Sequence, residues 1–513
     1  MLLEVVLLLV SLSACLWAWG KWCHGHWARL GVPSPPARPF TGHLHQVFSS
    51  TKPVWAWRNE AYLRHGGQRV CGLYNFLTPQ LLVGDPELLK GILVRDFDHF
   101  MDRRHLDLAG PEDQLWNDML NNATGDRWKR IRAAVTPAFT SSRLKGMFPL
   151  VAEKARVLNQ VTRSLAKKGE KVEMKGLLGR FSMDATASCG FGMECDSLNS
   201  KDSEFCRIAA IIFNPTMWRI MKLTSFYIAP RLCRALGMRA TSEGLMYFAK
   251  VVAATLNNRQ ETGENRGDFL DLMIESRKIS DETNPGNRKH ALDDITVVSQ
   301  AVVFLLSGYD NNATTLAFCC YFLAKHPHLQ EKAREEVLRL QRLHQGEDDE
   351  GDLSYEAVAE AKFLDACVSE TLRFYPIETA FNRQCVKDYM LGDTGLAVKK
   401  GTVVEIPVWS LHRDPQYWKD PEVFRPERFL PENKHEITPY TYLPFGAGPR
   451  NCIGQRFSYM VIKTALASLL KAVVMAPAAG HEGPPELAIS PVILRPKNGV
   501  YLTFKPITGA EGD

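Results

Sequence analysis

The feature of this sequence that most constrains its fold is one long apolar stretch, which begins near Asp293 and Asp294 and ends at Lys325. The two aspartates can cap the start of a helix, and the following His326-Pro327 can end it. At about 1.5 Å per residue, such a helix is roughly 50 Å long, which is the length of a whole domain. Its flanks, AVVFLL and LAFCCYFL, are apolar on every face, which predicts a helix buried in the middle of a large body.

A polar island, SGYDNNATT from Ser307 to Thr315, interrupts this helix at its centre. Burying the carboxylate of Asp310 beside two asparagines costs several kcal/mol unless partners are present. One interpretation is a satisfied structural network or a bend at the surface. We favour a functional site, because a carboxylate in the centre of an apolar helix usually serves a ligand or a reaction. Gly308 would let a flat ligand approach the backbone closely.

Composition limits the class of protein. The 513 residues could form one large domain or three ordinary ones, and neither a repeat nor a second linker divides them. A hydrophobic content of 45% supports a substantial core. The net charge of +5, without a block of lysine and arginine, argues against a nucleic-acid partner. The 12 cysteines show no zinc-ligand spacing, which predicts a reducing compartment for most of the chain.

The N-terminal segment MLLEVVLLLVSLSACLWAWG, residues 1–20, predicts a membrane span, because twenty helical residues cover roughly 30 Å. A cleaved secretory signal is the alternative, but it would begin with basic residues, whereas Lys21, Arg29 and Arg38 follow the apolar run. Cations on that side place it in the cytosol, which favours a retained signal anchor. The prolines that follow predict a stiff basic linker over residues 21–39, leaving 40–513 as one catalytic domain.

The decapeptide FGAGPRNCIG, Phe445 to Gly454, surrounds Cys452 with three glycines and a proline. Three kinds of site fit a cysteine in such a loop. The glycines could cradle a phosphate, the thiol could bind zinc or form a disulfide, or a lone thiolate could bind a larger cofactor.

Two further clusters carry charge at helical spacing. Glu370 and Arg373 in SETLRFYP share a helix face, and alone they would form an everyday surface ion pair. Arg428, in a long proline-rich segment, could join them in a buried network. Trp128 and Arg132 lie one turn apart, so their N–H groups could bind an anionic carboxylate or simply belong to an amphipathic helix.

Together these clusters resemble the cytochrome P-450 family, the haem-thiolate monooxygenases, over nearly the whole chain. The ten-residue loop is the most specific part of the resemblance, with Phe445, Gly448, Arg450, Cys452 and Gly454 at the family's positions. The other clusters match in order and separation, which chance would rarely produce.

The remaining matches assign roles by resemblance. Glu370 with Arg373 matches the family's helix pair, and Arg428 matches its third charge. Trp128 and Arg132 match the helix that reaches the haem propionates, and Arg383 in FNRQCVKDY looks like another propionate ligand.

The resemblance decides between the three uses of Cys452. A phosphate loop would follow a strand and carry the lysine and hydroxyl residue of a P-loop, and zinc would need companion ligands. A single thiolate on haem iron fits, because electron release from sulfur favours O–O cleavage. Loop amides and the start of the next helix, from Ile453 onward, would keep the thiolate ionised, and Arg450 would reach a propionate.

The resemblance implies a mainly α fold with a small β region, a helical prism around a buried haem b, with residues 293–325 across the distal face. It implies O2 and NADPH as co-substrates, NADPH-cytochrome reductase as electron donor and cytochrome b5 as a further candidate partner. The expected location is the endoplasmic reticulum membrane, with the catalytic domain in the cytosol. A basic surface of Lys129, Arg130, Arg450 and Arg456 would receive the acidic reductase.

The likeness is greatest to the animal microsomal group that oxidises drugs and toxins, which implies a lipophilic substrate. The resemblance places the substrate against segments 377–380 and 489–492, with contacts to Phe304, Ile377, Thr379, Ala380 and Val492. Residues 214–236 are expected to dip into membrane lipid, with a soluble surface patch or a core helix as alternatives.

One residue departs from the family pattern. A threonine usually follows the acid of the distal motif, but here Asp310 is followed by Asn311, and Thr314 and Thr315 come a turn later, roughly 5–6 Å along the axis. Our first hypothesis is a hydroxylase that inserts one oxygen atom from O2, with Asp310 and Asn311 as its catalytic pair. The alternatives are an isomerase or dehydratase that acts on a peroxide without external electrons, and a haem protein that only senses or binds.

Overall fold

The computed structural model describes residues 2–48, 52–104, 113–200, 203–213, 216–239, 241–275, 292–345, 353–488 and 493–507. Two sequence expectations fall partly or wholly outside these ranges. They are the wall segment 489–492 with its Val492 and the first two residues of segment 214–236.

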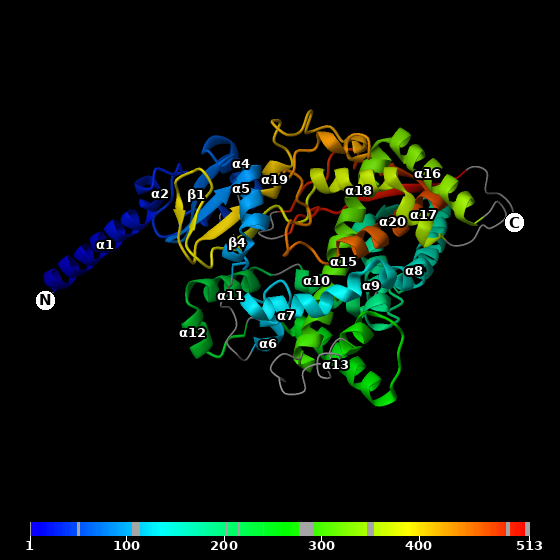
Figure 1. The fold of residues 1–513 in the computed structure, drawn as a ribbon, viewed down its shortest axis with the longest axis horizontal. Coiled ribbons are helices and arrows are strands. Elements are labelled where there is room, and N and C mark those ends of the chain that lie inside the picture. Colours follow the sequence, from blue (N-terminus) through cyan, green and yellow to red (C-terminus); the bar gives the residue numbers. More distant parts are fainter. Residues whose placement is uncertain are drawn as a thin grey trace.

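Helices are the main regular structure of the chain and small sheets accompany them, which confirms the predicted fold class (Figure 1). The long helices are α1 Leu2–His24, α4 Val54–Arg64, α7 Gly125–Val135, α8 Ser141–Lys168, α9 Met174–Phe191, α10 Glu204–Phe213, α11 Met217–Ile228, α13 Glu243–Thr262, α15 Asp294–Lys325, α16 Pro327–Gln345, α18 Lys362–Phe374 and α20 Gln455–Ala472. Shorter helices are α2 His26–Arg29, α3 His45–Phe48, α5 Pro86–Lys90, α6 Gln114–Asn117, α12 Pro230–Ala235, α17 Tyr355–Glu360 and α19 Val408–Leu411. Single turns are η1 Gly91–Arg95, η2 Phe97–His99, η4 Thr136–Phe139, η6 Pro426–Phe429 and η7 Lys434–Glu436.

Helix α15 runs through the body as the sequence predicts (Figure 1). The side chain of Asp293 caps it by accepting a hydrogen bond from the backbone N–H of Thr296 at 2.9 Å. The helix ends at Lys325, before His326, and most of its side chains are buried. Helix α9 packs closely along it, so the centre of α15 faces protein on one side and the cavity described below on the other.

The largest of the sheets lies toward the same end of the molecule as α1 (Figure 1). The largest sheet has the order β1-β2-β7-β4, from strands β1 Val70–Asn75, β2 Thr78–Val83, β7 Val403–Ile406 and β4 Phe381–Gln384. Strand β7 pairs parallel with β2 and antiparallel with β4. A second sheet joins β3 Lys171–Glu173, β9 Tyr501–Pro506 and β8 Val473–Pro477, and β5 Tyr389–Met390 pairs with β6 Ala397–Val398.

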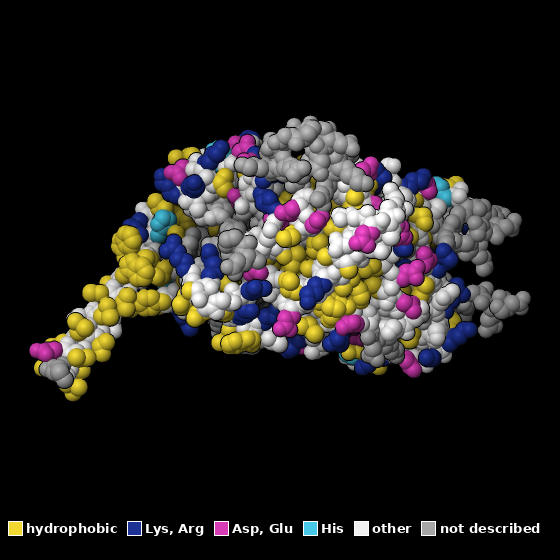
Figure 2. All heavy atoms as spheres, turned by 90° about the horizontal axis from the view of Figure 1, so that it is seen from below, with side chains coloured by type: hydrophobic (Ala, Val, Ile, Leu, Met, Phe, Trp, Pro, Cys, Tyr) yellow, Lys and Arg dark blue, Asp and Glu magenta, His cyan; other side chains and the backbone are white. Residues whose placement is uncertain are grey.

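The N-terminal helix projects from the body, and hydrophobic side chains cover it along its length (Figures 1 and 2). By length and composition α1 could cross a membrane. The residues after it contact the body, because Trp27 is buried against β1 and donates from its ring Nε1 to the carbonyl of Leu73 at 3.0 Å. The backbone of Pro33 accepts from Gly72 N–H at 2.8 Å. Residues 26–33 therefore dock on the sheet, while the division of the chain at residue 40 stays a prediction.

A buried ion network joins α18 to the irregular segment that follows α19. Glu370 and Arg373 are fully buried, with Arg373 Nε 2.7 Å from Glu370 Oε2, and Arg428 Nε lies 3.5 Å from Glu370 Oε1. Arg373 also donates to the backbone carbonyls of His412 and Pro421, each at 2.9 Å. The three charges that the sequence analysis grouped thus lie together and fix a segment that has little regular structure of its own.

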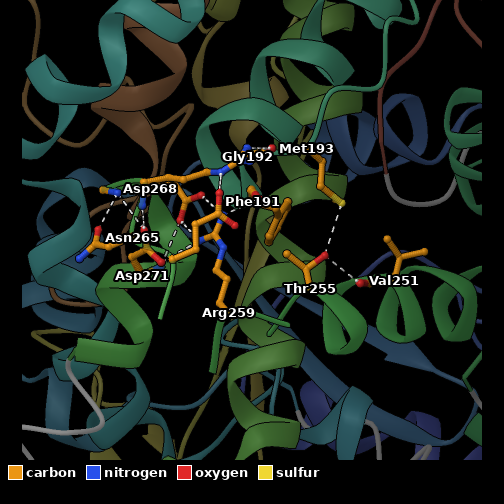
Figure 3. Close-up of polar contacts among 12 residues, drawn as sticks. Phe191, Gly192, Met193, Val251, Thr255, Arg259, Asn265, Asp268 and Asp271 are labelled. Carbon is orange, nitrogen blue, oxygen red and sulfur yellow. Dashed lines mark hydrogen bonds and ion pairs between the residues drawn. The ribbon is translucent and has the colours of Figure 1, made fainter. Parts of the chain in front are cut away.

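A second buried network was not foreseen from the sequence (Figure 3). Arg259 of α13 donates to Asp268 at 2.6 Å, to Asp271 at 2.8 Å and to the carbonyl of Phe191, at the end of α9, at 2.7 Å. Phe269, next to Asp268, stacks on the ring of Phe304 of α15 with 4.8 Å between ring centroids. The network therefore holds an aromatic side chain against the cavity wall.

We predict that Arg373→Ala costs about 3–5 kcal/mol of stability, because it leaves the buried carboxylate of Glu370 with weakened compensation. The variant should yield little cofactor-loaded protein and a lower Tm. Arg69→Ala is the matched control, because its partner Asp393 is exposed and such pairs contribute roughly 1 kcal/mol or less. Full cofactor loading in Arg373→Ala at an unchanged Tm would contradict a structural role.

Candidate active site

The main cavity lies between α7, α15, the segment 377–383 and the loop 443–454, and has a volume of about 260 Å³. Side chains from all four elements line it, although they are far apart in the sequence. It brings together Trp128, Arg132, Asn311, Arg383 and Cys452.

The loop around Cys452 is shaped by its glycines. Gly446 and Gly448 have φ angles of 69° and 74°, in the left-handed region that favours glycine. A Cβ on Gly448 would lie 1.8 Å from the carbonyl oxygen of Leu93, so only glycine fits there. The N–H of Cys452 donates to the carbonyl of Phe445 at 2.8 Å, closing a turn that presents the sulfur to the cavity.

Burial and nearby polar groups act in opposite directions on the Cys452 thiol. Burial raises its pKa, whereas the N–H of Gly454 and the charges of Arg103 and Arg132 lower it without outweighing burial. The following helix α20 begins at Gln455, two residues later than predicted, with Gly454 as its N-cap. That loop amides and the start of the next helix keep the haem-bound thiolate ionised stays a prediction, and the N–H of Gly454 acts in the predicted direction. A coordinated metal ion would supply the missing stabilisation of the thiolate.

Buried arginines surround the same cavity with unused hydrogen-bond donors. Arg383 is fully buried, and its Nε and Nη2 have no partner. Burial lowers the pKa of Arg383 well below its usual value and lowers that of Arg450 to about 9. The Nε atoms of Arg450 and Arg103 are also buried without a partner. Buried cations with unpaired donors require anions nearby.

Arg132 and Arg450, which were both expected at the site, use some of their hydrogen-bond donors in contacts within the protein. Arg132 donates to the backbone carbonyl and the side-chain oxygen of Asn451, both at 2.9 Å, so it braces the loop next to Cys452. Arg450 donates to the carbonyl of Met101 at 2.8 Å and lies over the ring of Trp128, 4.8 Å from its centroid. Arg450 is 3% exposed, so its expected place on a basic docking surface is wrong.

The α15 wall of the cavity is polar where the sequence predicts a site. Asn311 lines the cavity, and so does Ser307, one turn earlier on the same helix face. Ser307 is exposed to the cavity. The hydroxyl of Thr315 is committed to the carbonyl of Asn311 at 2.8 Å, and Thr314 is fully buried away from the cavity.

Asp310 does not line the cavity, although it was expected to act there with Asn311. Its carboxylate is buried between two cations, with Lys175 Nζ at 3.2 Å from Oδ1 and Arg495 Nη2 at 3.1 Å from Oδ2. These ion pairs compensate the burial cost that the sequence left unexplained.

Gly308 lines the cavity, where the sequence places a close approach of a flat ligand. A Cβ at this position would lie 2.7 Å from the side chain of Thr186, so the glycine also permits the close approach of α9.

The expected substrate wall is present in part. Phe304 and Ile377 line the cavity, as expected, but Thr379 and Ala380 do not. Thr379 instead accepts a hydrogen bond at its carbonyl from Trp409 N–H at 2.9 Å. Glu378 and Phe381 of the same segment line the cavity in their place.

Haem b fits the chemistry of these residues. It would bring two carboxylates to the unpaired donors of Arg383, Arg450 and Arg103, and an iron ion to the sulfur of Cys452. The apolar side chains between the two groups would contact a porphyrin.

Comparison with known proteins agrees with this assignment. The family model described as Cytochrome P450 matches residues 32–504. Cytochrome P450 3A11 of Mus musculus is 35% identical and covers 98% of each chain. Cytochrome P450 9e2 of Blattella germanica is 35% identical and covers 88% of each chain. Lithocholate 6-beta-hydroxylase of Mesocricetus auratus is 32% identical and covers 98% of each chain.

We predict that Cys452→Ala abolishes thiolate ligation. The ferrous carbon monoxide complex of the native protein should show the strongly red-shifted Soret band of a thiolate ligand, and the variant should lack it. Cys71→Ala is the control, because Cys71 is buried on β1 and does not line the cavity. A native protein with an unshifted band, or a variant that keeps the shifted band, would exclude Cys452 as the ligand.

Proposed function

The chain belongs to the cytochrome P450 family and is a haem-thiolate monooxygenase, and from this premise we propose that it hydroxylates lipophilic substrates in the cavity between α15 and the Cys452 loop. The observation that carries the proposal is the placement of Cys452 and the unpaired donors of Arg383 in one cavity. The hydroxylase among the relatives favours monooxygenation over the isomerase alternative.

Haem bound at Cys452 would supply the activation of dioxygen, which electron release from the thiolate favours. The chain's own residues hold the cofactor and supply protons. Arg383, Arg450 and Arg103 would bind its carboxylates, Trp128 would pack beside them, and Arg132 would brace the loop through Asn451.

The threonine that usually follows the acid of the distal motif would help to supply protons, and Asn311 stands in its place. Monooxygenation consumes protons as well as electrons, so the cavity needs a group that can donate, accept and reorient. A hydroxyl does all three, whereas the carboxamide of Asn311 has donors and an acceptor fixed in one plane. We propose that Ser307 provides the hydroxyl and that Asn311, one turn away, holds a water beside it.

Asp310 has a different task in this proposal. Its two ion pairs, with Lys175 and Arg495, keep its carboxylate away from the cavity wall. We assign it as a positioning residue that fixes the centre of α15 and thereby the side chains of Ser307 and Asn311.

The membrane and the electron donor complete the proposal. The apolar α1 would anchor the chain in the endoplasmic reticulum membrane with its body in the cytosol. Trp218 on α11 and Leu236 just after α12 are exposed, and α11 and α12 lie toward the same end of the molecule as α1 (Figure 1), which supports lipid contact over a core helix. NADPH-cytochrome reductase, with cytochrome b5 as a further candidate, would dock on Lys129, Arg130 and Arg456, which remain available without Arg450.

We predict that Ser307→Ala lowers the product formed per NADPH by roughly tenfold and raises peroxide release. The effect should stay below the ~100-fold typical of a general acid, because water can substitute in part. Turnover driven by added hydrogen peroxide, which brings its own protons, should stay nearly unchanged. The measurements are NADPH consumption with reductase, product and peroxide on the same sample.

Asn311→Thr in the Ser307→Ala background should restore much of the coupling, because it returns a hydroxyl one turn away. Ser410→Ala is a control for loss of a buried hydroxyl outside the cavity. Unchanged coupling in Ser307→Ala would refute the role of that hydroxyl. Product from a peroxide substrate without NADPH in every variant would instead favour the isomerase.

A further inference from the structure

The cavity wall carries one acidic side chain, Glu378, for which the proposed reaction has no use. Among the described residues that line the cavity, it is the only carboxylate. Glu378 acts on Arg383 through its charge, but among the described residues no hydrogen bond or ion pair joins the two, and the unpaired donors of Arg383, Arg450 and Arg103 are those assigned above to the carboxylates of haem. The remaining donors of the cavity's arginines have other partners. Arg450 pairs with Asp102 at 3.5 Å, Arg132 donates to Asn451 at 2.9 Å, and Arg383 donates to the carbonyl of Asn382 at 3.0 Å.

The backbone holds Glu378 in a fixed place. The carbonyl of Ile377, before it, accepts from Leu494 N–H at 2.8 Å, and the carbonyl of Thr379, after it, accepts from Trp409 N–H at 2.9 Å. Glu378 itself forms an antiparallel bridge with Ile493. Because the backbones of Ile377 and Thr379 are both hydrogen-bonded, the side chain of Glu378 projects into the cavity from a rigid segment and is exposed there. Such preorganisation reduces the entropy lost on binding.

A carboxylate in this position discriminates between ligands. A neutral lipophilic ligand that fills the cavity would strip water from the carboxylate and leave it uncompensated, which costs several kcal/mol. A ligand that brings its own cation to Glu378 avoids this cost and gains a charge-assisted contact. The aromatic rings of Phe304 and Phe381 on the same cavity wall add surface for the apolar part of the ligand.

We propose that Glu378 makes this enzyme selective for lipophilic amines, with the protonated nitrogen held at its carboxylate and the hydrocarbon portion in the cavity. This inference rests on the proposed function, since it names the substrate class of the same site. Glu378 is then a specificity-determining residue that acts by attraction to the cation and by rejection of neutral molecules.

The test compares two ligands of one shape on the haem-loaded full chain. One is the phenylpropyl-trimethylammonium ion, and the other is its uncharged analogue, in which carbon replaces nitrogen. The ammonium ion neither titrates nor ligates iron, so its affinity reports on the protein's charge. Binding is followed by the change of iron spin state in the absorption spectrum.

We expect the native enzyme to prefer the cation and Glu378→Gln to weaken its binding by about tenfold, which corresponds to about 1.4 kcal/mol. The uncharged analogue should bind the variant as well as, or better than, the native enzyme. Glu436→Gln is the matched control, because Glu436 is exposed on η7 and does not line the cavity. It should leave both affinities unchanged.

Two results would overturn the inference. One is an unchanged preference between the two ligands in Glu378→Gln. The other is a lower haem content of that variant with an unchanged preference in its haem-loaded fraction, which would mean that Glu378 serves to balance the charge of the arginines. Either result would leave NADPH-dependent hydroxylation and the thiolate Soret band of the native enzyme intact, whereas failure of the proposed function would remove the NADPH-dependent product in the native enzyme itself.

Discussion

Buried arginine nitrogen atoms that have no hydrogen-bond partner are the constraint on which this site depends. Arg383 is fully buried with two unpaired nitrogen atoms, and burial lowers its pKa well below the usual value. Proteins tolerate such a cation only where an anion joins it. The sulfur of Cys452 opens to the same cavity, where burial raises the pKa of its thiol and a bound metal ion would stabilise the thiolate. One cofactor, haem, would satisfy both features, because it would bring carboxylates to the arginines and a metal ion to the sulfur.

Polar contacts between segments that are distant in the sequence fix the position of the Cys452 loop within the fold. Arg373 is fixed by Glu370 and donates to the carbonyl of His412. The ring Nε2 of His412 accepts from Leu443 N–H at 2.8 Å, at the start of the Cys452 loop. Burial lowers the pKa of His412 to about 3, so it stays neutral and can accept that bond at physiological pH. The chain of contacts leads from α18 to the loop that presents the thiol.

The sequence predicted those features of the structure that a local pattern of residues determines. Capping aspartates and an apolar run defined α15 to its last residue, and a specific motif located the Cys452 loop. It could not show which side chains of a segment face the cavity, because that depends on distant partners. Asp310 turns toward Lys175 and Arg495, and Arg495 is 185 residues away. Glu378 replaces Thr379 at the wall for the same reason, since the hydrogen bonds from α19 and from residue 494 set the rotation of that strand-like segment.

The claim that buried arginines and one thiolate form a single haem site is tested most directly by adding porphyrins to the haem-free protein. Iron protoporphyrin and its dimethyl ester have the same ring and metal, but the ester lacks both negative charges. We predict that the free acid binds in equal proportion to protein and gives the thiolate spectrum, whereas the ester binds at least about a hundredfold more weakly, about 2.7 kcal/mol. Equal affinity for the ester would contradict the account, because the arginines would then have no part in holding the cofactor.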